Sequence, residues 1–205
     1  MNVSTTLLAF MLLIFVLQII SPSITNLFVF VPDYALSEPW RFVTSMFLHD
    51  GFMHIFFNGF ALLMFGSILE RRVSSKEYLI IFFGAGLLGS FLYYLTMFTP
   101  LAPLCSSPSG GVWGCPALGA SGAIYGILGA VAVLLPEAVV YIYFFPVKMK
   151  YAPFLWFFLE LLGIFNSGSG IANAAHLGGL IFGLICGWYL SKKQQDFYQP
   201  TWQQQ

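Results

Sequence analysis

Residues 118–135 read LGASGAIYGILGAVAVLL, an apolar stretch that opens with a Gly-Ala-Ser-Gly tetrapeptide. Residues 171–190, IANAAHLGGLIFGLICGWYL, form a second apolar stretch with a histidine near its start. A transmembrane helix needs about 20 predominantly apolar residues. The two stretches therefore predict two membrane spans, each of which holds one reactive polar side chain, Ser121 and His176, close to its beginning.

The whole chain has the composition of a membrane protein. Of its 205 residues, 59% are hydrophobic and 8% are charged, whereas soluble domains carry about 25% charged residues. Four more apolar stretches, at roughly 6–21, 52–69, 78–98 and 151–165, give six expected spans. We therefore expect an all-α membrane protein, a six-transmembrane-helix bundle, in which residues 1–193 form a single membrane domain and residues 194–205 a short polar cytoplasmic tail. The net charge of zero gives no indication of nucleic-acid binding.

Basic residues predict the orientation of the spans. Seven of the eight lie between the second and third spans, between the fourth and fifth, or after the sixth: Arg71, Arg72, Lys76, Lys148, Lys150, Lys192 and Lys193. Cytoplasmic loops carry an excess of Lys and Arg, so these segments and both termini are expected inside. Only Arg41 is then outside, and the second, fourth and sixth spans begin at the outer face. Residues 1–6 carry no basic residue, so we interpret 6–21 as a span and not as a signal peptide.

Two features between the spans stay open. Cys105 and Cys115 both lie in the outer segment before the fourth span, where an oxidising exterior permits a disulfide; two free thiols are the alternative. The apolar patch 138–147, interrupted by proline, is interpreted as interfacial or as an extension of the fourth span.

Ser121 and His176 are candidates for a nucleophile and its base. Gly119 and Gly122 allow a sharp turn around Ser121, and the free amides of a first helical turn favour a developing negative charge. A serine hydroxyl is a weak nucleophile until a base removes its proton. Small residues line one face of each span: Gly122, Gly126 and Gly129, and Ala175, Gly179, Gly183 and Gly187. Such faces let two backbones come close, which would bring Ser121 to His176; packing alone is the alternative reading.

Polar residues of the second span complete this candidate site. His54 and Asn58 are spaced i, i+4 and share one helix face. Together with the Ser121 backbone N–H they suit an oxyanion hole; a polar patch that hydrates the helix end is the alternative. Tyr125, one turn after Ser121, is placed to stack on the His176 ring. Because the second, fourth and sixth spans hold no Asp or Glu in their apolar parts, a Ser–His dyad fits better than a triad.

Glu160 is the acid in the fifth apolar stretch, where an ionisable side chain is costly. It is expected to be protonated, hydrogen-bonded internally or facing a wet cavity, and the sequence assigns it no role. A metal site is disfavoured, because the three histidines, His49, His54 and His176, form no His-Glu-x-x-His pattern and no carboxylate is placed to complete a zinc set.

Taken together, these residues resemble the rhomboid intramembrane serine proteases. The motifs that carry the resemblance are Trp40-Arg41, His49, His54 with Asn58, Gly119-Ala120-Ser121-Gly122 with Tyr125, and Ala175-His176 followed by Leu-Gly-Gly. The Cys105…Cys115 segment is not part of the family pattern. The resemblance implies a compact prokaryotic form without a seventh span, a multi-pass protein of the cell (inner) membrane.

The resemblance also implies roles for single residues. They are Ser121 as nucleophile, His176 as general base, His54, Asn58 and the Ser121 amide as oxyanion hole, Tyr125 as the ring stacked on His176, Gly119 beside the hole, His49 as a support of the outer loop, and Trp40 and Arg41 as its anchors in the lipid interface. It implies no cofactor, membrane lipid as surroundings and single-pass membrane proteins as substrates, cut near the outer face. The alternatives are a catalytically inactive relative that binds or escorts membrane helices, and a small channel or transporter with Glu160 on its pathway.

Overall fold

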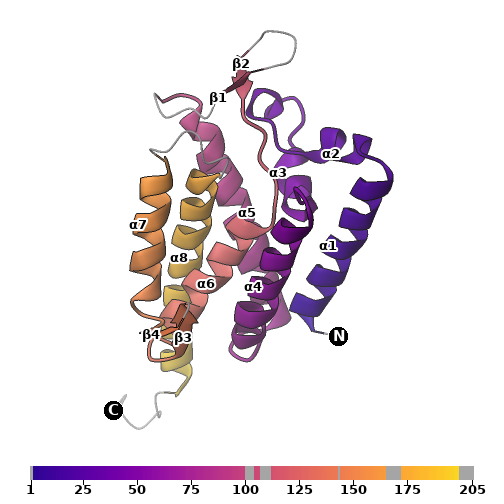
Figure 1. Cartoon of the computed structure of the whole chain (residues 1–205). Coiled ribbons are helices and arrows are strands. Elements are labelled where there is room, and N and C mark those ends of the chain that lie inside the picture. The colour runs from indigo at the N-terminus through magenta and orange to yellow at the C-terminus, as the bar shows by residue number, and fades with distance from the viewer. Residues whose placement is uncertain (1, 100–103, 107–111, 143, 165–171, 199–205) are drawn as a thin grey trace.

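The computed structural model describes residues 2–99, 104–106, 112–142, 144–164 and 172–198, and shows a bundle of helices with a β hairpin at either end (Figure 1). The main helices are α1 (Val3–Ile20), α4 (Phe52–Glu70), α5 (Ser75–Thr96), α6 (Ser121–Leu134), α7 (Ala152–Ile164) and α8 (Asn173–Tyr198). Between α1 and α4 lie α2 (Ser23–Phe28), the 3-10 helix η1 (Pro32–Tyr34), α3 (Arg41–Thr44) and the 3-10 helix η2 (Ser45–Phe47).

The helices agree in part with the six expected spans. In the described part of the chain, α1, α4, α5 and α8 are long and apolar enough to cross a membrane, whereas α6 and α7 are shorter apolar helices. The short α6 begins only at Ser121, because Gly119 makes a turn with a φ of 117° just before it. Pro136 follows its last residue by two positions, and proline cannot continue a helix.

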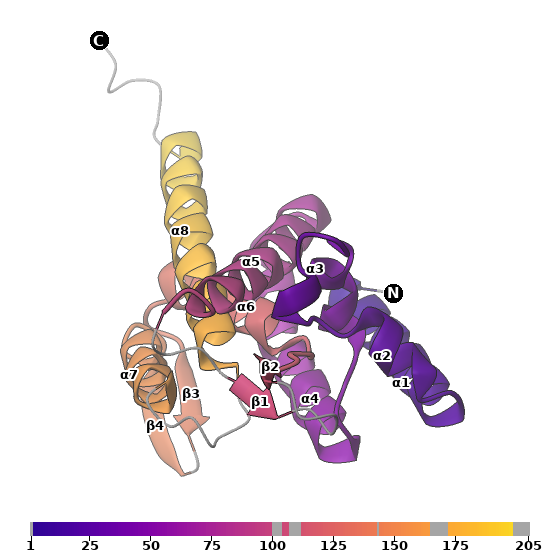
Figure 2. The same ribbon diagram turned by 90° about the horizontal axis from the view of Figure 1, so that it is seen from above.

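The central helix of the bundle is α6, which contacts α4, α5 and α8 (Figure 2). Ten of its fourteen residues are buried, from Gly122 to Ala132. The first turn of α6 is therefore enclosed by the neighbouring helices, and Ser121, its first residue, is partly buried. Helix α6 begins on the side of the bundle that faces α2 and α3 (Figure 1).

The segment 138–147 does not extend α6, which was one of the two interpretations of the sequence. It forms a hairpin in which β3 (Val139–Ile142) pairs antiparallel with β4 (Phe145–Lys148). Val139, Val140 and Ile142 are β-branched and favour a strand. Glu137 closes the hairpin through Lys148 (2.7 Å) and Lys150 (2.6 Å), and these ion pairs lower the pKa of the Glu137 carboxyl to about 2.

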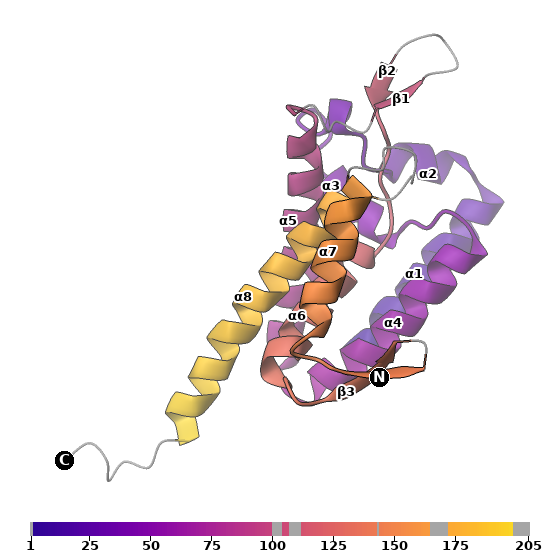
Figure 3. The same ribbon diagram turned by 60° about the vertical axis from the view of Figure 1, so that its left-hand side comes forward.

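The last helix continues past the expected domain boundary at residue 193, because α8 runs to Tyr198 and projects from the bundle (Figure 3). Lys193 Nζ lies 2.9 Å from Glu77 Oε1, and Gln194 Nε2 donates to the Arg72 carbonyl oxygen at 2.9 Å. The first residues of the expected tail are thus helical and attached to the turn between α4 and α5. Residues 199–205 lie outside the described part.

The opposite end of the bundle holds the long segment between α1 and α4. Arg41 is buried there and donates through Nη1 to the carbonyl oxygens of Asn26 (2.8 Å) and Val29 (2.7 Å). Trp40 is half exposed. Arg41 therefore holds this segment together by internal hydrogen bonds, which is a different arrangement from the expected anchor in the lipid interface.

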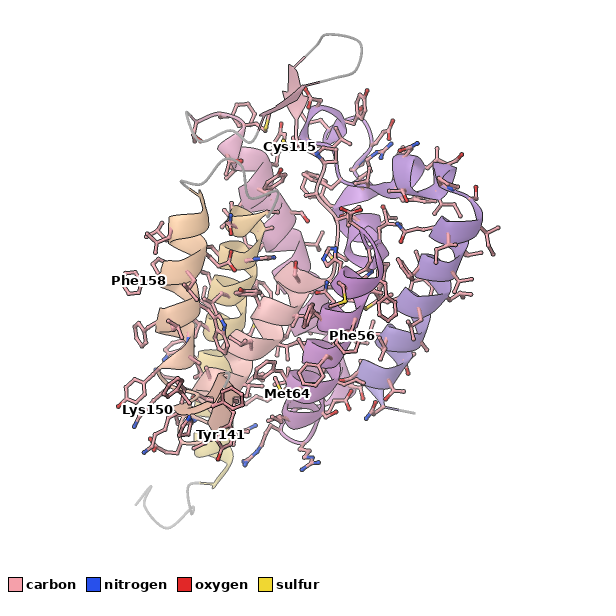
Figure 4. All side chains as sticks on the ribbon, viewed as in Figure 1. Phe56, Met64, Cys115, Tyr141, Lys150 and Phe158 are labelled. Carbon is pink, nitrogen blue, oxygen red and sulfur yellow. The ribbon has the colours of Figure 1, made fainter. Side chains whose placement is uncertain are left out.

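A second hairpin lies above this segment, where β1 (Leu104–Ser106) pairs antiparallel with β2 (Val112–Gly114). Cys115, labelled in Figure 4, follows β2 and is disulfide-bonded. Its carbonyl oxygen accepts a hydrogen bond from the Tyr93 hydroxyl of α5 at 2.9 Å. Cys186 in α8 is a free thiol, and the side chain of Cys105 is not among those that the structure describes.

Candidate active site

Ser121 and His176 meet at the contact between α6 and α8. The Nε2 atom of His176 lies 2.7 Å from the Ser121 hydroxyl oxygen. The approach depends on glycine, because a Cβ atom on Gly179 would overlap the carbonyl oxygen of Gly122. A Cβ atom on Gly129 would lie 2.7 Å from the Leu180 carbonyl oxygen. The small-residue faces noted in the sequence thus form the contact between the two backbones.

Tyr125 lies one turn below Ser121 and covers the His176 ring. The two ring centroids are 4.6 Å apart and the ring planes differ by 7°, which is a stacked arrangement. Stacking leaves the imidazole little freedom to rotate, so the Nε2 atom stays directed at Ser121.

A carboxylate lies on the other side of the same imidazole. Glu160 of α7 is buried, and its Oε1 atom lies 3.0 Å from Nδ1 of His176. The Tyr125 hydroxyl donates a hydrogen bond to the same oxygen. The Nδ1–Oε1 pair has the separation of an ion pair but is not aligned as a hydrogen bond. The sequence had identified Glu160 as a costly acid in an apolar stretch without linking it to His176.

His54 and Asn58 of α4 border the turn that precedes Ser121. His54 Nδ1 accepts a hydrogen bond from the Asp50 backbone N–H (3.3 Å), so the neutral ring carries its hydrogen on Nε2. A Cβ atom on Gly119 would lie 2.7 Å from this Nε2 and 3.9 Å from Asn58 Nδ2. Asn58 uses Nδ2 to donate to the His54 carbonyl oxygen at 3.0 Å, which occupies one of its two hydrogens. Two side-chain donors therefore converge on the backbone at Gly119.

Backbone amides add further donors at the same place. The first amides of a helix have no partner within the helix, and α6 has no side-chain cap at its N-terminus. Ser121 is the first residue of α6, so its own N–H belongs to this group. The Ser121 N–H thus adds a third donor, two residues along the chain from Gly119.

His49 lies behind His54, and their rings meet edge to face with centroids 5.1 Å apart. The His49 ring is buried, and within the described residues neither ring nitrogen has a hydrogen-bond partner. Burial, together with the nearby His54, lowers the pKa of His49 to about 4, so the ring is neutral at pH 7. Its backbone is fixed by Gln18 of α1, which accepts from the His49 N–H (3.0 Å) and donates to its carbonyl oxygen (3.3 Å).

A small cavity of about 30 Å³ adjoins Ser121. Its walls come mainly from small residues of η2, α5, α6 and α8, among them Ser45, Ser90 and Ala175. A cavity of this volume is large enough to hold a water molecule. Within the described residues, no group of three His, Cys, Asp or Glu side chains is arranged to hold a metal ion.

Comparison with known proteins gives the family. Residues 36–193 match the rhomboid domain. The chain belongs to the rhomboid family. The resemblance seen in the sequence motifs is thereby confirmed, and with its long apolar helices this rhomboid is a multi-pass integral membrane protein.

Three relatives illustrate the similarity. "Rhomboid protein 1, mitochondrial" of Saccharomyces cerevisiae is 32% identical over 165 residues, which cover 78% of this rhomboid and 44% of that protein. "Rhomboid protease GluP" of Bacillus subtilis is 33% identical over 163 residues, or 74% of this rhomboid and 26% of the relative. "RHOMBOID-like protein 6, mitochondrial" of Arabidopsis thaliana is 30% identical over 168 residues, which cover 80% of this rhomboid and 47% of that protein. The chain thus spans less than half the length of each.

Proposed function

We propose that this chain is an intramembrane serine endopeptidase, which hydrolyses peptide bonds of transmembrane substrates near the outer face of the membrane. The observation that carries the proposal is the 2.7 Å separation between Ser121 Oγ and His176 Nε2 inside a bundle of apolar helices. A serine hydroxyl bonded to an imidazole that a second group orients is the arrangement of an activated nucleophile. Family membership and a relative named as a rhomboid protease support the same reading.

The proposed reaction follows from the geometry. Ser121 attacks the substrate carbonyl carbon while His176 Nε2 takes the hydroxyl proton. The carbonyl oxygen becomes an oxyanion and is held by His54 Nε2–H, Asn58 Nδ2–H and the Ser121 N–H. His176 then gives its proton to the leaving amine, the first product departs, and water hydrolyses the acyl-enzyme by the reverse proton transfers.

Substrate access is proposed beside α7. Trp156 of α7 meets Phe65 of α4 edge to face, with centroids 6.2 Å apart. On the outer surface of α7, Phe154 and Phe158 are exposed, and Phe158 points away from the bundle (Figure 4). A substrate helix that unwinds between α4 and α7 would reach Ser121 with an extended segment.

The proposed topology has six spans with both termini in the cytoplasm of a prokaryotic cell. In the structure, α1 begins and α8 ends at the same end of the bundle as the β3–β4 hairpin and the turn between α4 and α5 (Figure 1). Seven of the eight basic residues belong to these segments, which supports a cytoplasmic location for this end. The site then lies toward the outer face, where water can enter.

The test is cleavage of a panel of single-pass membrane proteins by the purified full chain in liposomes. The wild type is expected to cut some of them, and Ser121→Ala and His176→Ala are expected to cut none while remaining folded. A fluorophosphonate probe should label the wild type at Ser121. A catalytically inactive relative that only binds membrane helices would give neither label nor cleavage, and cleavage by Ser121→Ala would refute the assignment.

A further inference from the structure

We infer that Glu160 is a positioning residue for His176, so that the site works as a Ser–His–Glu triad and not as an isolated dyad. This inference rests on the proposed function and deepens it. Its basis is one oxygen atom, Glu160 Oε1, which lies against both the Tyr125 hydroxyl and Nδ1 of His176.

The surroundings of Glu160 point to this role. It lies in the apolar helix α7, with its side chain only 9% exposed. Its second carboxylate oxygen is buried and has no hydrogen-bond partner among the described residues. A buried acid with an unused oxygen is unfavourable for folding. Because this placement costs stability without full compensation, the presence of Glu160 next to His176 is better explained by the chemistry of that histidine.

The tautomer of His176 gives the physical reason. To accept the Ser121 proton, Nε2 must be unprotonated, and the neutral ring then carries its hydrogen on Nδ1. The carboxylate oxygen 3.0 Å from Nδ1 favours this tautomer over the one with hydrogen on Nε2. When the ring takes the serine proton, the same carboxylate stabilises the imidazolium.

The alignment of His176 Nδ1 with Glu160 Oε1 agrees with an electrostatic role for the carboxylate. Nδ1 and Oε1 are close but not aligned as a hydrogen bond, and catalytic hydrogen bonds are often misaligned before substrate binds. Tyr125 fixes both partners, since its ring stacks on His176 and its hydroxyl donates to Glu160. In the described part of the chain, Ser121 and Tyr125 from α6 and Glu160 from α7 contact the imidazole, and His54 of α4 is near enough to interact with its charge.

The decisive variants are Glu160→Gln and Glu160→Asp. Glutamine keeps an oxygen that can accept from Tyr125 and from Nδ1–H, but removes the charge; aspartate keeps the charge at a greater distance. Glu137→Gln is the control, because Glu137 is an exposed acid of the hairpin that precedes α7. Each variant is compared with wild type and Ser121→Ala for kcat, KM, the rate of fluorophosphonate labelling and the thermal unfolding temperature in detergent.

We expect Glu160→Gln to lower kcat by roughly 10²- to 10³-fold, less than the about 10⁴-fold loss when a serine protease triad loses its aspartate charge. KM should stay within about twofold, since Glu160 acts through His176 and not on the substrate. The labelling rate should fall with kcat, while the unfolding temperature should stay equal or rise. Glu160→Asp should lie between wild type and Glu160→Gln, and Glu137→Gln should match wild type.

Other outcomes overturn the inference. A wild-type kcat in folded Glu160→Gln does so, as does an activity loss that appears only in KM or only in proportion to unfolded protein. If the glutamine variant does not fold, Glu160→Asp carries the test, and unchanged kcat and labelling there overturn the role. If the wild type neither cleaves substrates nor is labelled by the probe at Ser121, the proposed function itself is refuted, and the role of Glu160 is refuted with it.

Discussion

Gly179 of α8 lies so close to Gly122 of α6 that a Cβ atom on Gly179 would overlap the Gly122 carbonyl oxygen. Gly122 is the residue after Ser121, and Gly179 lies one turn after His176. The backbone contact and the contact between the two reactive side chains therefore belong to the same helix crossing. Any change that separates the helices at Gly179 also separates Ser121 Oγ from His176 Nε2.

Gly179→Ala should lower both stability and activity. The new methyl group meets backbone and not a movable side chain, so α6 and α8 must shift. Overpacking of a tight core costs about 1–3 kcal/mol, and small displacements of catalytic groups cost up to about 10²-fold in rate. The measurements are the unfolding temperature in detergent and kcat.

Gly59→Ala is the matched control for that substitution. Gly59 is also a helical glycine, but its Cβ would meet the end of a flexible side chain, Leu8 Cδ1, at 2.8 Å. Leu8 can rotate, and alanine favours the helix over glycine by about 1 kcal/mol. Equal losses in the two alanine variants would contradict the importance of the α6–α8 contact.

Gly119→Ala should both strain the backbone and remove activity. Its φ of 117° is strained for alanine, at about 1–3 kcal/mol, and its Cβ would lie 2.7 Å from Nε2 of His54, one of the proposed oxyanion donors. Gly51→Ala separates the two effects, because Gly51 has a φ of 95° and nothing within 4 Å of the added Cβ. We expect similar destabilisation in both variants and loss of kcat only in Gly119→Ala; equal kcat values would remove His54 from the hole.

The sequence predicted those elements whose signal lies within one helix or one short motif. The glycine spacing of 118–135 and 171–190 indicated close faces, and the structure brings Ser121 and His176 together there. Positions that depend on how separate helices rotate against each other were not predictable. Glu160 belongs to α7, whose apolar sequence gives no register against α8, so its contact with His176 emerged only in three dimensions.

Local interactions explain the other features that the sequence analysis did not predict. The patch 138–147 is apolar enough for a helix, but β-branched residues and the ion pairs of Glu137 favour a hairpin. Gln18 is a polar residue within the first apolar stretch, and its partners are the Thr25 hydroxyl and the backbone groups of His49, 31 positions away. An isolated polar residue in a membrane span indicates that a partner exists, but not which one.

Asn58→Ala tests the proposed oxyanion hole from the side of α4. Its Nδ2 is directed toward Gly119 and would stabilise charge that exists only during the reaction. Loss of one such donor lowers kcat by about 10²- to 10³-fold with little change in KM. Folding should be nearly intact, because among the described residues the amide makes one hydrogen bond, to the His54 carbonyl oxygen. An unchanged kcat would remove Asn58 from the hole.

His49 should make the fold sensitive to acid. Its pKa is about 4 in the folded chain, against about 6.5 in an unfolded one. Above pH 6.5 the ring is neutral in both states, so its contribution to stability is complete. As pH falls from 6.5 to 4, only the unfolded chain takes up this proton, and the free energy of unfolding decreases by up to about 1.4 kcal/mol per pH unit, about 3 kcal/mol in total. Unfolding temperatures of wild type and His49→Gln between pH 7 and pH 4 measure this, because the two proteins differ by one titratable side chain. The variant should lose less stability than wild type over this range; parallel curves would show that His49 is not the acid-sensitive group.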